Sequence, residues 1–86
     1  MNLYINNLHQ NFIEADIHRL FAPYGEIDSV KLIRDKHNNR SRGSAFVIMP
    51  VEKQGSEAMM NLDGTLLNGK AISVTEVKYD PSFKAF

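Results

Sequence analysis

The stretch that decides the fold is RGSAFVIM, residues 42–49, in which two sets of residues alternate along the chain. Successive side chains of a β-strand point to opposite faces of its sheet, so each set is expected on one face. The set expected to face the core is Ala45, Val47 and Met49, and the set expected on the opposite face is Arg42, Ser44, Phe46 and Ile48. The stretch therefore predicts a strand with one core face and one face that carries an aromatic ring.

A second alternating stretch, LYINNL at residues 3–8, lies near the start of the chain. Leu3 and Ile5 are expected in the core, so Tyr4 points the other way. If the two strands pair, Tyr4 and Phe46 become neighbouring rings on one open face, with the Arg42 guanidinium at its edge. Two aromatic plates beside a cation suit stacked bases and a phosphate, so this arrangement predicts binding of single-stranded nucleic acid.

The whole chain predicts the element order strand, helix, strand, strand, helix, strand. The four strands are expected at residues 2–7, 27–34, 42–49 and 70–77, with a hairpin turn at Asn68-Gly69. The first helix is expected from about residue 13 to residue 24, with Asn11 as its cap. The second helix is expected to open at Pro50, and its predicted buried stripe is Val51, Gly55, Ala58, Met59 and Leu62.

Each predicted helix has one apolar face, and each predicted strand has one strongly apolar face. Both helices should therefore pack on the same side of a four-stranded sheet, and the other side of the sheet should stay open. Gly55 is costly inside a helix, which indicates that the second helix packs closely on the sheet at that residue. The expected fold class is α+β.

The composition fits one small domain. The chain has 86 residues, of which 43% are hydrophobic and none is cysteine, and its ten basic and ten acidic residues cancel. No apolar run approaches the roughly 20 residues of a membrane span, and no secretory signal is evident, so we expect a cytoplasmic protein. We expect a domain at residues 1–78 and a tail at residues 79–86, with a local basic edge between residues 34 and 42.

No constellation of residues predicts catalysis or a metal site. His9, His18 and His37 lack metal-ligand spacing, the acidic residues are scattered, and there is no glycine-rich phosphate loop. We therefore expect a protein that is not an enzyme and that needs neither a metal nor another cofactor.

Taken together, these residues resemble the RNA recognition motif family. Residues 3–8 resemble its hexamer motif, with Tyr4 at the base-stacking position. Residues 42–49 resemble its octamer motif, with Arg42 at the phosphate-contacting position and Phe46 at an aromatic position. The resemblance implies a ferredoxin-like βαββαβ fold, and the chain is similar to the small single-domain members found in bacteria.

The function expected from the residues and the resemblance is binding of short single-stranded RNA by a monomer, with single-stranded DNA as an alternative ligand. The residues expected to contact RNA are Tyr4, Asn6, Lys31, Arg40, Arg42, Ser44, Phe46, Ile48, Thr75 and Lys78. Ser44 departs from the family pattern, because the octamer has an aromatic ring there and a serine cannot stack on a base. Two rings at about 1–3 kcal/mol per stacked base predict weak binding that depends on phosphate contacts from the basic 34–42 loop.

Two further questions stay open at the level of sequence. Ser44, the zero net charge and the outward-facing Ile33 and Ile48 also fit a protein-binding module on the same fold, one that takes a peptide or a second copy of the chain. The tail carries three aromatic residues within eight positions. These either have no role or let the tail fold across the open face, where it would extend or cover the binding surface.

Overall fold

The computed structural model describes residues 1–38 and 41–78. It contains the strands β1 (Asn2–Asn6), β2 (Ser29–Arg34), β3 (Ser41–Ile48), β4 (Leu66–Leu67), β5 (Lys70–Ala71) and β6 (Ser73–Val77), the helices α1 (Glu14–Phe21) and α2 (Glu52–Leu62), and the short 3-10 helix η1 (Ala22–Tyr24).

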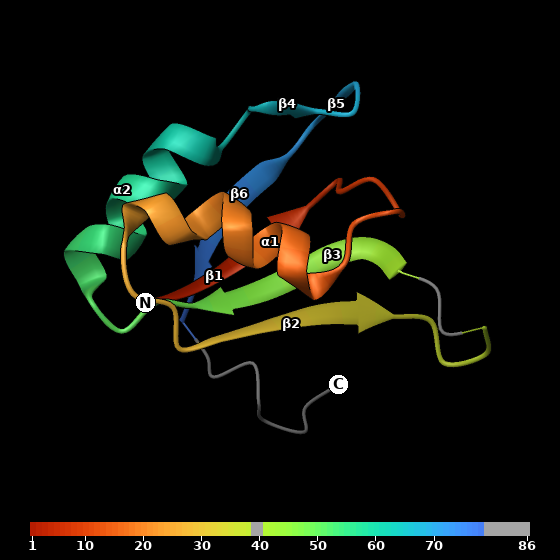
Figure 1. Ribbon diagram of the computed structural model, residues 1–86, viewed down its shortest axis with the longest axis horizontal. Helices are drawn as coiled ribbons and strands as arrows, with labels where there is room; N and C mark the ends of the chain where they lie inside the picture. The colour runs from red at the N-terminus through yellow and green to blue at the C-terminus, as the bar shows by residue number, and fades with distance from the viewer. Residues whose placement is uncertain (39–40, 79–86) are drawn as a thin grey trace.

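The main sheet has four strands in the order β2-β3-β1-β6, and every neighbouring pair is antiparallel. Figure 1 shows α1 and α2 together on one side of this sheet. The α+β architecture expected from the sequence, a ferredoxin-like four-stranded antiparallel sheet with two helices on one face, is confirmed.

The core lies between the sheet and the two helices. The inward-facing residues of β1 and β3 are fully buried, as the alternation predicts, and they are Leu3, Ile5, Ala45 and Val47. The helices contribute Ile17 and Phe21 from α1 and Ala58 and Leu62 from α2. Burial of these apolar side chains fixes which face of each strand is left for other uses, because a shift of one residue would turn every side chain over.

The first helix is shorter than predicted and has a different beginning. It starts at Glu14, and the backbone N–H of Ile13 donates to Asp16 Oδ2 at 2.9 Å. The prediction of Asn11 as the cap is wrong, because its backbone N–H donates to the His9 ring at 3.1 Å, within a turn that precedes the helix. The last predicted turn is the 3-10 helix η1, where Pro23 lacks the N–H that an α-helix would need.

The second helix confirms the close approach at Gly55 and corrects one residue of its stripe. A Cβ at Gly55 would lie 2.9 Å from the sulfur of Met1, so the helix packs against the beginning of β1 there. Val51, predicted to be buried, is 41% exposed. It precedes the first helical residue and has an extended backbone, so it does not lie on the helical stripe.

The last predicted strand is divided in two. Lys70–Ala71 pairs with Leu66–Leu67 as a separate hairpin, and Ser73–Val77 joins the main sheet. The hairpin turn predicted at Asn68-Gly69 is confirmed, and both residues have the positive φ that such a turn requires. Among the helices of residues 1–38 and 41–78, none is long and apolar enough to cross a membrane.

Candidate nucleic-acid interface

The helix-free face of the sheet is built from three rows of side chains that run across its strands. The registers place Ser29, Ile48, Asn2 and Val77 in the first row and Lys31, Phe46, Tyr4 and Thr75 in the second. Ile33, Ser44, Asn6 and Ser73 belong to the third row. Most of the residues predicted to bind RNA therefore share one face, with Tyr4 and Phe46 side by side at its centre.

The Tyr4 and Phe46 rings contact each other. Their centroids are 5.2 Å apart and their planes are inclined by 48°, which is within the range of favourable aromatic pairs. The two residues are direct cross-strand partners, so the sheet register fixes this contact. The pairing predicted from the two alternating stretches is confirmed.

The sequence places both rings on an open face, and the exposure that this implies is wrong for Phe46. Tyr4 is partly exposed, but only 4% of Phe46 is exposed. Tyr4 lies beside Phe46 on β1, and the long side chain of Lys31 lies opposite it on β2. Alternation in the sequence predicts the face on which a ring lies, but it does not predict how far the neighbouring side chains close over that ring.

Ser44 is a second buried member of this face, with 7% of its surface exposed. The Tyr4 hydroxyl donates to Ser44 Oγ at 3.1 Å, and Ser44 Oγ donates to Asn6 Oδ1 at 2.8 Å. These two hydrogen bonds fix the outer end of the Tyr4 ring. Ser44 therefore holds the Tyr4 hydroxyl in place from the neighbouring strand. This differs from the direct RNA contact predicted for Ser44.

A hollow of about 600 Å³ lies over β2, the beginning of the loop that follows it and the aromatic pair. Its lining residues are Tyr4, Lys31, Leu32, Ile33, Arg34, Asp35, Lys36, His37, Arg42 and Phe46. Among the described residues of this lining are four cationic side chains and one carboxylate, and that carboxylate accepts a hydrogen bond from the backbone N–H of His37 at 2.8 Å. Aromatic surface next to an excess of positive charge is the combination that single-stranded nucleic acid requires.

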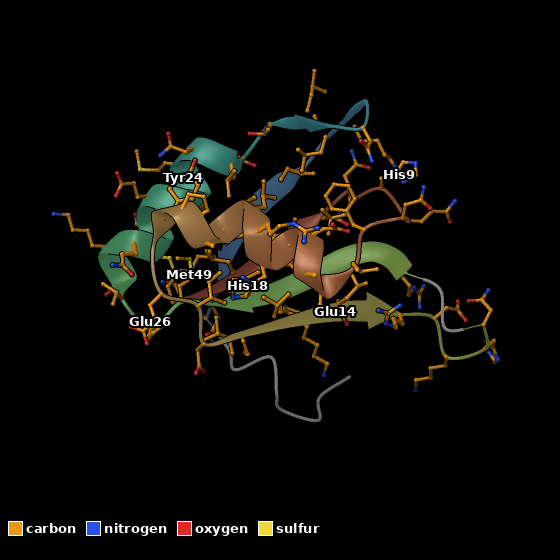
Figure 2. The ribbon with its side chains drawn as sticks, viewed as in Figure 1. His9, Glu14, His18, Tyr24, Glu26 and Met49 are labelled. Atoms are coloured by element: carbon orange, nitrogen blue, oxygen red, sulfur yellow. The ribbon has the colours of Figure 1, made fainter. Side chains whose placement is uncertain are left out.

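The cations predicted at the basic edge are not equivalent. Both Arg34 and Arg42 line the hollow, but Arg42 is exposed, whereas Arg34 Nη2 forms an ion pair with Glu14 Oε1 at 2.8 Å. Figure 2 shows Glu14 at the beginning of α1, next to the end of β2. The Arg34 guanidinium is therefore bonded to the helix layer at the edge of the hollow, and none of the described ion pairs involves Arg42. Arg40 lies outside the described residues.

The remaining predicted residues are spread over the sheet. Thr75 is exposed beside Tyr4, and Ile48 is half-buried in the first row. Lys78 follows β6 at the end of the sheet where β1 begins, and its Nζ lies 3.4 Å from Glu76 Oε1. Arg42 lies at the opposite end, so the structure does not bring Lys78 and Arg42 together. The aromatic tail, residues 79–86, lies outside the described residues.

Two features of the site go beyond the prediction from sequence. The bonding of Ser44 to Asn6 could have been found, because pairing Tyr4 with Phe46 places Asn6 opposite Ser44. The ion pair of Arg34 with Glu14 joins residues 20 positions apart on a strand and a helix, and no local pattern indicates it. In the described part of the chain, no group of three or more His, Cys, Asp or Glu residues is arranged to hold a metal ion.

The fold and this face define a class of protein: a small α+β domain whose helix-free sheet face presents paired aromatic residues and cations. The comparison with protein families then identifies it, since the family described as "RNA recognition motif" matches residues 3–73. The chain belongs to the RNA recognition motif family.

Relatives of similar size support this assignment. A Nostoc sp. protein, RbpD, whose name describes it as RNA-binding, is 38% identical over 78 residues, which cover 91% of this chain and 83% of that protein. The crystal structure of RNA binding protein PG1 superposes with a TM-score of 0.90 at 33% identity and covers 94% of this chain and 98% of that one.

Other relatives are much longer than this chain. The U11/U12 small nuclear ribonucleoprotein 31 kDa protein of Arabidopsis thaliana is 34% identical over 73 residues, and the match covers 85% of this chain but only 28% of that protein. The domain is therefore the part that is shared, and the activity of the longer proteins as wholes is a separate matter.

Proposed function

We propose that this chain binds a short segment of single-stranded RNA on the helix-free face of its sheet. The observation that carries the proposal is the Tyr4–Phe46 ring pair, which borders a hollow lined by Lys31 and Arg42. One base stacks on the accessible Tyr4 ring, and the next approaches the hollow. The family supports this role, and so does a solved relative, the Sxl-lethal protein/RNA complex, at 27% identity and a TM-score of 0.86 over 94% of this chain.

Phe46 has a different role from Tyr4 in this proposal. Because Phe46 is 4% exposed, a base reaches its ring only when neighbouring side chains move aside, whereas Tyr4 is accessible as it stands. Lys31 is the cross-strand neighbour of Phe46 on β2, and its aliphatic stem is long enough to cover apolar surface beside that ring. Ordering these side chains costs free energy, which is consistent with weak binding to a short ligand.

The phosphate contacts are assigned to Arg42 and to the cations around the hollow. Salt weakens such contacts, because each phosphate that a cation neutralises releases a counterion. Thr75 and the Asn6 amide flank Tyr4 on β6 and β1, and they supply polar contacts to the base edges. The proposed role is binding without a chemical step.

The test is a titration of the chain with an eight-nucleotide single-stranded RNA of mixed sequence, followed by fluorescence anisotropy. Single-stranded DNA and duplex RNA of the same length are the comparison ligands. We expect Tyr4→Leu to weaken binding by about fivefold to 150-fold, which corresponds to the loss of about 1–3 kcal/mol of stacking. Tyr24→Leu is the matched control, because Tyr24 lies in the helix layer (Figure 2).

Three outcomes would contradict the proposal. RNA affinity that is the same in the Tyr4→Leu variant as in the unchanged chain would remove the stacking assignment. Binding of duplex RNA as tight as that of single strands would contradict base stacking as its basis. If the chain instead binds a peptide or a second copy of itself, with an affinity that does not change when salt is added, the protein-binding alternative is favoured.

A further inference from the structure

A second hollow adjoins the first at the end of the sheet where β1 ends and β3 begins. It has a volume of about 350 Å³ and is lined by Leu8, His9, Gln10, Arg42, Gly43 and Lys70. Arg42 also lines the hollow over the aromatic pair, so this residue borders both hollows. A strand of nucleic acid that leaves the sheet face past Arg42 therefore meets this second hollow next.

Hydrogen bonds hold the segments around the second hollow in place. The backbone N–H of Leu8 donates to the carbonyl oxygen of Gly43 at 2.9 Å, which joins the loop after β1 to β3. Asn7 Nδ2 donates to the carbonyl oxygen of Ala71 at 2.9 Å, which joins the end of β1 to β5, next to Lys70. Figure 1 shows the β4–β5 turn and the loop after β1 at this same end of the sheet.

The polar groups of the second hollow suit an anion. Arg42 and Lys70 carry positive charge, and no carboxylate is among the described residues that line the hollow. Among the ion pairs that the structure describes, none involves Arg42 or Lys70.

His9 adds a hydrogen-bond donor to this surface. Its Nδ1 accepts the backbone N–H of Asn11 at 3.1 Å, so in the neutral ring the proton is on Nε2, which is the donor that remains. Figure 2 shows His9 on the loop after β1, near the β4–β5 turn. Two cations and an imidazole N–H around one hollow match the oxygen atoms of a phosphodiester.

We propose that this second hollow is a phosphodiester-binding site for the RNA backbone beyond the stacked bases. The proposal rests on the function proposed above, and it assigns contacts to Lys70 and His9, which that function does not use. It also predicts a length dependence. A trinucleotide occupies the sheet face alone, whereas an octanucleotide also reaches Lys70.

The experiment compares Lys70→Gln with Lys53→Gln in titrations with oligouridines of three and eight nucleotides, followed by NMR. Both variants remove one exposed lysine charge, but Lys53 lies in α2 beside Glu52 and Glu57, on the helix layer. We expect Lys70→Gln to weaken binding of the octanucleotide about threefold to tenfold and to leave the trinucleotide unchanged. Lys53→Gln should leave both unchanged.

The salt dependence gives a second readout that loss of folding would not produce. Raising salt from 50 to 200 mM lowers octanucleotide affinity in both the unchanged chain and Lys70→Gln. Because Lys70→Gln lacks one phosphate contact to the single strand, its decline should be about 2.6-fold smaller than that of the unchanged chain. In the unchanged chain, the octanucleotide should also shift the backbone amide resonances of His9 and Lys70, and the trinucleotide should not.

The outcomes separate the two proposals. If the unchanged chain binds the octanucleotide but Lys70→Gln behaves as Lys53→Gln does, or if the His9 and Lys70 resonances do not move, this site is refuted and the sheet-face function stands. If the unchanged chain binds neither oligonucleotide, both proposals are refuted.

Discussion

The Tyr4 hydroxyl donates a hydrogen bond to Ser44 Oγ at 3.1 Å, across the pair of strands that forms the centre of the sheet. The Ser44 hydroxyl in turn donates a hydrogen bond to Asn6 Oδ1 at 2.8 Å. The serine stands where the family pattern has an aromatic ring, and in its place this chain has a hydroxyl group that accepts a hydrogen bond from Tyr4. The Asn6 oxygen is occupied by this chain of bonds, which leaves the Asn6 amide nitrogen as the donor offered to a base.

The first prediction concerns this support. Ser44→Ala removes the partner of the Tyr4 hydroxyl, so the ring loses its fixed orientation and must be ordered when RNA binds. We expect RNA affinity to fall by about two- to twelvefold, which corresponds to a net hydrogen-bond contribution of about 0.5–1.5 kcal/mol. Fluorescence anisotropy with the eight-nucleotide RNA measures it.

A double-mutant cycle tests whether the effect of Ser44 acts through Tyr4. Tyr4→Phe should cost about as much affinity as Ser44→Ala, and the double variant should cost little more than either single one. Fully additive losses would show that Ser44 acts independently of the ring. Ser56→Ala is the control, because Ser56 lies in α2.

The second prediction separates the two rings by their burial. Phe46 is 4% exposed, so Phe46→Ala should lower the free energy of unfolding by about 3–5 kcal/mol, as is typical of buried aromatic residues. Tyr4→Ala should cost clearly less, because its ring is partly exposed. Urea denaturation measures both values. Equal destabilisation by the two substitutions would contradict the difference in burial.

RNA binding by a Phe46 variant is informative only when the variant is folded. Phe46→Leu keeps most of the apolar volume and removes the ring, so its RNA affinity can be read under conditions where denaturation shows the native state. A loss of affinity in Phe46→Leu would assign a base contact to this ring. Unchanged affinity would limit Phe46 to supporting Tyr4 at 5.2 Å between ring centroids.

The alternation of side chains was sufficient to predict the fold and the face of the site, for a physical reason. A strand with a strict period of two has one choice of buried face, so Leu3 and Val47 fix the direction in which Tyr4 and Phe46 point. The pairing of segments that are close in sequence can also be predicted, as it is for the two short strands joined by the Asn68-Gly69 turn.

Features that depend on competition between partners were not predictable from sequence. Asn11 has a side chain suited to capping, but Ile13 is the N-cap residue, and its backbone N–H donates to the carboxylate of Asp16 inside the helix. The exposure of Phe46 depends on how far the side chains around its ring close over it, and a period of two contains no information on that. The same holds for Arg34, whose partner Glu14 comes from another layer of the fold.

The third prediction concerns Gly43, the residue between Arg42 and Ser44. Its φ is +80°, and a Cβ there would lie 2.9 Å from the backbone oxygen of Leu8. Gly64 has a similar φ of +84° but open space around it. Gly43→Ala should therefore destabilise the fold by about 1–3 kcal/mol more than Gly64→Ala, because it adds a backbone clash to the shared conformational strain.

Urea denaturation of the two alanine variants compares these glycines directly. The crowding at Gly43 involves backbone atoms that are fixed by the Leu8 to Gly43 hydrogen bond, so the clash cannot be relieved by rotation of a side chain. If the two variants lose the same free energy of unfolding, the close approach of the loop after β1 to β3 does not contribute.

The last prediction separates Arg42 from Arg34 by the partners that each has. Arg42→Gln should reduce the slope of log affinity against log salt by about 0.7, the value for one phosphate of a single strand. Arg34→Gln should change that slope less, because the Arg34 guanidinium is held by Glu14 at 2.8 Å. Arg34→Gln should instead lower the free energy of unfolding, by less than about 1 kcal/mol, because the ion pair that it removes is partly exposed. Anisotropy titrations of both variants at several salt concentrations measure the slopes. A larger change for Arg34→Gln than for Arg42→Gln would mean that the ion pair opens when RNA binds.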